Sequence, residues 1–246
     1  GLNLTRGYAG QISLAQAAFI GIGAYVSALM TLAGWHWLVT VPCAVALTFV
    51  IGLAVGFPAL RVKGHFLAFV TLAFSAIAVL VLRNEEWLTG GVYGLSNMPR
   101  PDFGFFDASK RSVVMGISMT PTTKMYYVCL AVFLVFSALM YGVIRSPWGR
   151  AFKGLRENPI RAESLGVDTR RLTLLAFAIG SAYGGLAGAL VTPLVQFIEP
   201  GSFGLVHSLR ILLMVVVGGA GFFFGPFVGA AVVILMPEFL RFTEGY

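Results

Sequence analysis

Charged residues are absent from several long stretches of the chain. No Asp, Glu, Lys or Arg occurs from residue 7 to residue 60, and shorter uncharged runs cover 64–82, 125–144, 172–198 and 211–237. A bilayer core about 30 Å thick needs about 20 apolar helical residues, so the first run has room for two crossings. The pattern predicts about six membrane-spanning helices, at Leu14–Ala33, Leu38–Phe57, Phe66–Leu82, Met125–Ile144, Leu172–Val195 and Leu209–Leu235.

The first and last of these segments are interrupted by glycine and polar residues. The last contains Gly218-Gly219-Ala220-Gly221 and then Gly225-Pro226. Non-helical backbone at membrane depth persists only where protein or a water-filled cavity satisfies its polar groups, and interrupted segments point to transport sites. Small residues also let helices pack closely without any transport role, so the glycines leave both interpretations open.

Basic residues gather in two connections between the predicted helices. Arg61 and Lys63 lie in the first, and residues 145–171 hold seven basic residues. The positive-inside rule makes both 61–64 and 145–171 cytoplasmic loops. Strict alternation then places the loop 84–124 outside the cell and the C terminus in the cytoplasm.

The amino-acid composition excludes a soluble protein. Of 246 residues, 58% are hydrophobic and 11% are charged, against about 25% charged in an ordinary soluble domain. The net charge of +7 fits membrane orientation better than a nucleic-acid partner. We therefore expect an all-α polytopic membrane protein that forms one transmembrane domain over 1–246. Because the chain starts with Gly1 inside an apolar motif, we also expect a truncated N terminus.

Catalytic chemistry has no visible place in the chain. No HExxH, GxSxG or P-loop motif occurs, and the two cysteines suggest neither a disulfide nor a metal site. The three histidines lie near segment ends, as expected for interfacial positions. We predict no enzyme activity, no cofactor and no metal. An autonomous ion-coupled carrier would want acidic residues at mid-depth, whereas Glu199 and Glu238 lie at segment ends.

The basic loop 145–171 has a pattern of its own. Residues 149–157 and 159–165 each predict a short helix, because Pro159 suits a first turn and Gly166 a helix end. Basic and apolar residues alternate along both helices, which suits docking on a partner protein. Contact with anionic lipid is the alternative, but the Glu157-Asn158-Pro159 corner favours docking.

Four collinear stretches resemble one known family. They are residues 1–25, with Gly7-Tyr-Ala-Gly-Gln-Ile-Ser-Leu-Ala-Gln16, residues 89–101, the loop 149–166 and residues 175–189. Together they resemble the LivM-type permease subunit of branched-chain amino acid ABC importers. The resemblance implies a bacterial-type plasma membrane location, a second LivH-type permease subunit, two ATP-binding cassette subunits that hydrolyse ATP, and an extracytoplasmic substrate-binding protein.

The resemblance also implies a mechanical role for the loop, as a coupling helix that fits a groove on the ATPase. The matching residues are Gly149, Arg150, Arg156, Glu157, Asn158, Ala162, Glu163 and Gly166. Arg156 and Glu157 would be its polar anchors.

A substrate pathway is suggested by polar side chains in the apolar first segment. These side chains also suit a second role, in which they satisfy broken backbone or bridge helices. These polar side chains are Asn3, Tyr8, Gln11, Ser13 and Gln16. Gln16 stands where the family often has His.

Alternative functions are an importer for another small solute, such as urea, an amide or an aromatic acid, and an autonomous secondary carrier.

Overall fold

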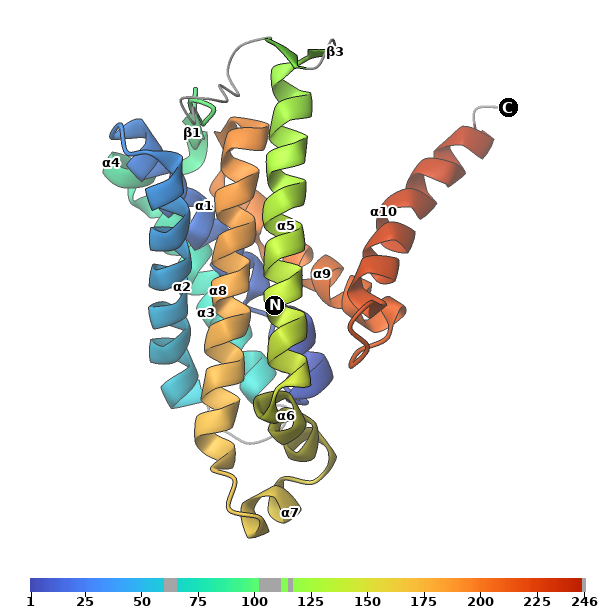
Figure 1. The fold of residues 1–246 in the computed structure, drawn as a ribbon. Coiled ribbons are helices and arrows are strands. Elements are labelled where there is room, and N and C mark those ends of the chain that lie inside the picture. Colours follow the sequence, from blue (N-terminus) through green and yellow to red (C-terminus); the bar gives the residue numbers. More distant parts are fainter. Residues whose placement is uncertain (60–65, 102–111, 115–116, 245–246) are drawn as a thin grey trace.

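The computed structural model describes residues 1–59, 66–101, 112–114 and 117–244 and shows a bundle of long helices (Figure 1). The predicted cytoplasmic loop 61–64 and part of the loop 84–124 lie outside these residues. Within them, the long helices are α1 (Gln16–Leu32), α2 (Trp37–Ala59), α3 (Phe66–Asn84), α5 (Pro121–Arg145) and α8 (Thr169–Val195).

These helices match the first five predicted segments to within a few residues. Their starts follow capping rules: the Thr120 side chain accepts a hydrogen bond from the Thr123 N–H ahead of α5, and Asp168 accepts one from the Arg171 N–H ahead of α8. Among the described helices, four are long and apolar enough to cross a membrane, namely α2, α3, α5 and α8. The protein is therefore an all-α polytopic membrane protein.

The centre of the bundle is a close packing of α1, α2 and α8. A side chain added at Gly23 of α1 would collide with the backbone of Gly185 on α8. One added at Gly188 of α8 would collide with the backbone of Ile20 on α1. The Thr192 hydroxyl on α8 donates to the Ala24 carbonyl on α1 at 3.1 Å. Small residues bring the backbones together because, in a bilayer, apolar side chains gain little over lipid tails.

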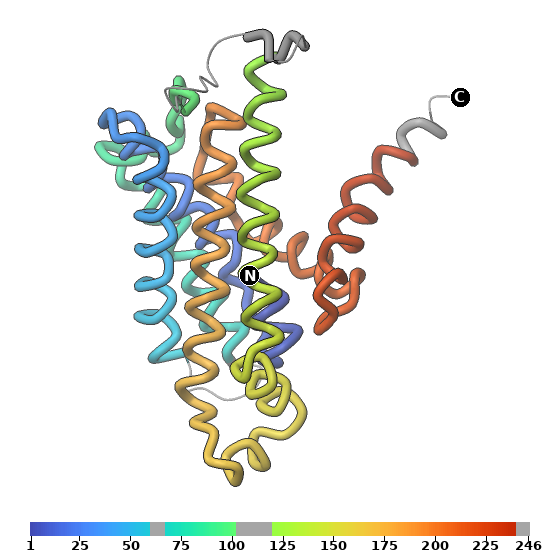
Figure 2. The backbone as a smooth tube through the Cα atoms, in the orientation of Figure 1, coloured from blue at the N-terminus to red at the C-terminus, as the bar shows by residue number. Residues whose placement is uncertain are grey.

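The sixth predicted segment was wrong as a single crossing. The chain forms α9 (Leu205–Gly218), a turn, and α10 (Gly225–Glu244). Gly219 and Gly221 have φ of +95° and +96°, a conformation that glycine adopts readily. α9 and α10 pack on each other, and α10 runs back towards the end of the molecule that carries β1 and β3, away from the rest of the bundle (Figures 1 and 2). The cytoplasmic position of the C terminus, which assumed one continuous crossing here, stays a prediction.

Short elements cover the two ends of the bundle. At one end lie α4 (Glu86–Thr89), η2 (Gly91–Tyr93) and η3 (Pro200–Phe203), with β1 (Leu95–Ser96) antiparallel to β4 (Phe197–Ile198) and β2 (Ser112–Val114) antiparallel to β3 (Ile117–Met119). The opposite end carries α6 (Pro147–Glu157) and α7 (Pro159–Ser164) (Figure 1). The two short helices predicted in the basic loop are thus confirmed.

Candidate functional site

The first 15 residues form a broken segment, as the glycine pattern predicted. A short π-helix, η1 (Leu4–Tyr8), ends before Gly10, which has φ +70°, and regular helix resumes only at α1. Neighbouring elements satisfy the exposed backbone: the Leu14 N–H donates to the Thr71 hydroxyl at 3.0 Å and the Ala17 N–H to the Ser208 hydroxyl at 3.1 Å. This is the arrangement expected of irregular backbone held inside a membrane protein.

The two broken segments meet at Asn3. Its side-chain amide donates to the Phe222 carbonyl at 2.9 Å, and its side-chain oxygen accepts from the Gly221 N–H at 3.1 Å. A side chain added at Gly7 would collide with the Gly221 backbone. The interruption near the start of the chain and the turn between α9 and α10 are therefore in direct contact.

Arg156, on α6 of the basic loop, also contacts the place where the two broken segments meet. Its guanidinium donates to the Gly7 carbonyl at 2.6 Å, and a side chain added at Gly221 would collide with that guanidinium. A charge-assisted hydrogen bond of this length is among the stronger kinds. Helix α6 is thus tied to both broken segments through one side chain.

A buried face fixes α6 against the bundle. Phe152 and Leu155 lie in a core cluster with Leu4 and Tyr8 of η1. Gly149 lies so close to the Ile144 carbonyl that no side chain fits there, which allows the sharp turn from α5 into α6. These contacts make α6 and η1 one packed unit.

The α6–α7 corner is built by local hydrogen bonds. The Asn158 side chain accepts from the Arg161 N–H at 3.1 Å and so caps α7. Gly166, with φ +81°, ends α7, and the Thr169 hydroxyl donates to Glu163 at 2.6 Å across this end. Ala162 is buried within the corner. Asn158, Ala162, Glu163 and Gly166, four of the predicted coupling residues, therefore shape the loop.

The outward face of α6 and α7 combines charged and apolar side chains. Arg150 and Glu157 are exposed there, and Trp148, Ile160 and Leu165 have 58%, 76% and 84% of their surface exposed. Exposed large apolar groups beside charged ones are typical of a surface that binds another protein.

A cavity of about 640 Å³ lies between η1, α5, α8, α9 and α10. Asn3 and Gln16 line it, and the Gln16 side-chain amide donates to the Gly180 carbonyl at 3.2 Å. Tyr8, Gln11 and Ser13 are not among its lining residues. Tyr8 belongs to the core cluster beneath α6, and the Ser13 hydroxyl accepts from the Ala15 N–H at 3.4 Å. Of the five predicted pathway residues, two therefore line the cavity, and the buried side-chain oxygen of Gln11 has no hydrogen-bond partner among the described residues.

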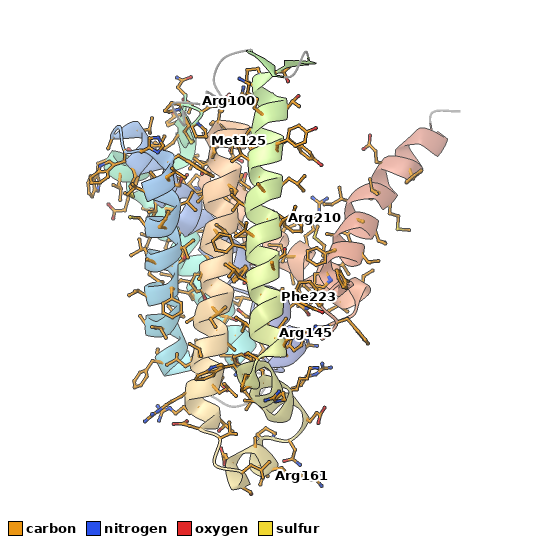
Figure 3. The ribbon with its side chains drawn as sticks, viewed as in Figure 1. Arg100, Met125, Arg145, Arg161, Arg210 and Phe223 are labelled. Carbon is orange, nitrogen blue, oxygen red and sulfur yellow. The ribbon has the colours of Figure 1, made fainter. Side chains whose placement is uncertain are left out.

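Arg210 also lines this cavity, although sequence reasoning assigned it no role. It belongs to α9, and Figure 3 places it about midway along α5, between Arg100 at one end of the molecule and Arg145 at the other. The available signal was an arginine next to an uncharged run of 27 residues, at 211–237. Because the run was interpreted as one crossing from Leu209 to Leu235, the sequence did not place Arg210 in a cavity.

Comparison with known proteins agrees with the family resemblance of the four sequence stretches. The family described as "Branched-chain amino acid transport system / permease component" matches residues 1–244. The chain is 34% identical over its whole length to the high-affinity branched-chain amino acid transport system permease protein LivM of Escherichia coli K12, and it spans 61% of that relative's length.

Two further relatives differ more. A probable LivM permease protein of Methanocaldococcus jannaschii is 28% identical over 85% of the chain and 54% of its own length. The LivH permease protein of Escherichia coli K12 is 30% identical over 47% of the chain and 37% of its own length. No solved structure matches the chain.

Proposed function

Because this chain belongs to the family of permease components of branched-chain amino acid transport systems, we propose that it is the LivM-type transmembrane subunit of an ATP-binding cassette importer. The importer moves branched-chain, hydrophobic amino acids that a substrate-binding protein delivers outside the cell. Its partners are a LivH-type permease subunit and two ATPase subunits, which carry out the hydrolysis. The complex lies in a bacterial-type plasma membrane.

The single observation that carries the proposal is the series of contacts that connects the outward face of α6 and α7 to the two broken segments. The outward face of these helices docks on an ATPase subunit, with Arg150 and Glu157 as polar contacts and Ile160 and Leu165 as apolar ones. Inward, Arg156 holds the Gly7 carbonyl and lies against Gly221. A movement of α6 is therefore passed directly to both interruptions.

ATP binding to the ATPase subunits acts by favouring one arrangement of α6, η1 and the α9–α10 turn over another. A coupling of this kind requires only that docking of α6–α7 differs in free energy between outward-facing and inward-facing states. Since η1 and the α9–α10 turn both border the cavity, a shift of their contact at Asn3 changes the shape of the cavity. Asn3 and Gln16 line the substrate pathway, and Tyr8 and Ser13 stabilise the broken segment beside it.

The cytoplasmic position proposed for the loop 145–171 decides which end of the molecule lies on which side of the membrane. With 145–171 in the cytoplasm, the end of the molecule with α4, η2 and β1 faces outward, where the loop 84–124 meets the substrate-binding protein. Trp87 and Tyr93 are 82% and 91% exposed at this end. The C-terminal end of α10 then lies on the outer side, in place of the cytoplasmic side expected from the sequence.

An importer for another small solute remains the second candidate. The two predicted pathway residues that line the cavity, Asn3 and Gln16, carry uncharged amides, which also suit urea or another amide. An autonomous carrier is disfavoured by the docking surface on α6–α7, which such a protein does not need.

Uptake of radiolabelled leucine into proteoliposomes tests the proposal. Vesicles contain this chain, its LivH-type partner, the ATPases and the binding protein, with ATP inside the compartment that holds the ATPases. We expect uptake that fails when any one component is left out and that excess isoleucine and valine compete away. Stimulated ATPase activity without leucine uptake would favour another solute. Uptake by this chain alone would reject the importer.

A further inference from the structure

In the part of the chain that the structure describes, one permanently charged side chain lines the cavity. It is Arg210, which lies midway along the bundle, is exposed on the open side of the cavity, and forms no ion pair or hydrogen bond with the described residues. A cation at membrane depth is costly, and such residues usually face a cavity and pair with an anion. Arg210 therefore lacks the partner that its position calls for.

No acidic side chain of this chain lines the cavity in the part that the structure describes. The acidic residue of α10 nearest to the lining is Glu238, one turn beyond the lining residue Ile234, and it forms no ion pair with Arg210. The remaining polar groups there are neutral or already engaged: Asn3 binds the α9–α10 turn, and the Tyr183 hydroxyl donates to the Phe136 carbonyl at 2.8 Å. His207, one turn before Arg210, adds a second basic group.

The walls around Arg210 are apolar. Phe133 and Phe136 come from α5, Leu186 and Leu190 from α8, and Met214 and Phe227 from α9 and α10. The volume of about 640 Å³ is within the range of small-molecule sites. One cation in an apolar chamber matches a ligand with one carboxylate and a branched hydrocarbon tail.

We propose that Arg210 binds the carboxylate of the transported solute while the apolar walls hold its side chain. The inference rests on the proposed transport function and deepens it by naming the group that is recognised. Because the described lining residues offer no carboxylate to an ammonium group, the amino end contributes little to recognition. The solute class is therefore a small, branched aliphatic carboxylate, with or without an amino group.

Three ligands that share one isobutyl group separate these contributions. They are leucine, 4-methylpentanoate, which lacks the amine, and leucinamide, which lacks the carboxylate. Saturation-transfer NMR on the complete permease–ATPase complex in deuterated lipid nanodiscs, without binding protein, measures the affinity of each through its methyl signals. We expect leucine and 4-methylpentanoate to bind comparably and leucinamide to bind at least about tenfold more weakly.

Variants assign the effect to Arg210. We expect R210Q to weaken leucine and 4-methylpentanoate at least about tenfold, to leave leucinamide unchanged, and to be partly rescued by R210K. R83Q, an exposed arginine on α3 away from the cavity, is the control. Equal binding of all three ligands, unchanged binding in R210Q, or no binding to the wild-type complex would overturn the inference. In each case, intact leucine uptake by the same wild-type complex would leave the transport function standing.

Discussion

Gly188 and Gly142 both lie inside long helices, but only Gly188 faces another backbone. A Cβ at Gly188 would collide with the Ile20 carbonyl of α1, whereas a Cβ at Gly142 of α5 would meet nothing within 4 Å. We expect G188A to lower the free energy of unfolding by about 1–3 kcal/mol because it overpacks the α1–α8 contact. We expect G142A to leave stability unchanged or raise it by up to about 1 kcal/mol, through better helix propensity.

Thermal unfolding of the purified protein in one detergent compares the two variants directly. Equal stability of G188A and G142A would contradict the close approach of α1 and α8. The comparison is matched because both changes add one methyl group within a helix.

Single residues show what the sequence could and could not predict. Pro159 and Gly166 were placed correctly because their roles, a first helical turn and a helix end, depend on neighbouring residues alone. Arg156 was expected to be a polar anchor for docking, yet its guanidinium points inward to Gly7. The two residues are 149 positions apart, and no local pattern reports such a contact.

Helix α7 carries the most exposed apolar side chains of the coupling loop. Ile160 in its first turn and Leu165 directly after its last residue are 76% and 84% exposed, and we expect both to contact an ATPase subunit. Changing either to Asp introduces a charge that must be desolvated on docking. We expect I160D and L165D to fold normally but to bind the ATPase at least about tenfold more weakly in co-purification assays.

V92D is the matched control for these variants. Val92 is also a large apolar residue, 55% exposed, but it lies in η2 at the opposite end of the molecule. ATPase binding should be unaffected by V92D. Full ATPase binding by both I160D and L165D would show that α7 is not the docking helix.

Whole elements were predictable where each has an apolar run of its own. The apolar runs gave α5 and α8 with predicted starts at Met125 and Leu172, and the observed starts lie four and three residues earlier, directly after the capping residues Thr120 and Asp168. The pair α9 and α10 was missed because both helices are apolar and uncharged from residue 211 to 237, which is also how one crossing looks. The glycines at 218–221 indicated a break but could not give the angle between the two helices.

The path of α10 sets which end of the molecule carries its last residues. If 145–171 is cytoplasmic, Glu238 lies on the outer side, because α10 runs towards the end that carries β1 (Figure 1). We expect a cysteine at Glu238 to react with an impermeant maleimide from outside intact cells, as a cysteine at exposed Val92 does. A cysteine at exposed Leu165 should react only after the membrane is opened. Labelling of positions 238 and 165 from the same side would contradict the hairpin of α9 and α10.

At the scale of the molecule, the sequence predicted an all-α membrane protein with a coupling loop, and the structure adds how its parts are joined. The broken start of the chain, the α9–α10 turn and α6 converge at Asn3, Gly221 and Arg156. Their convergence depends on the packing of segments that are far apart in sequence. It connects the surface proposed to bind the ATPase to the cavity proposed to hold the solute.

The number of leucine molecules moved per ATP hydrolysed, in R156Q and R150Q, tests this connection most directly. Both residues are arginines of α6, but only Arg156 among them bonds to η1. In fully assembled vesicles, we expect R156Q to retain ATPase activity while leucine uptake per ATP falls about tenfold, because the broken segments no longer follow α6. R150Q removes a proposed polar contact to the ATPase but leaves the bond between Arg156 and η1 intact, so we expect its total turnover to fall while the leucine moved per ATP stays at the wild-type value. A wild-type ratio in R156Q would contradict the claim that Arg156 couples ATP hydrolysis to the broken segments.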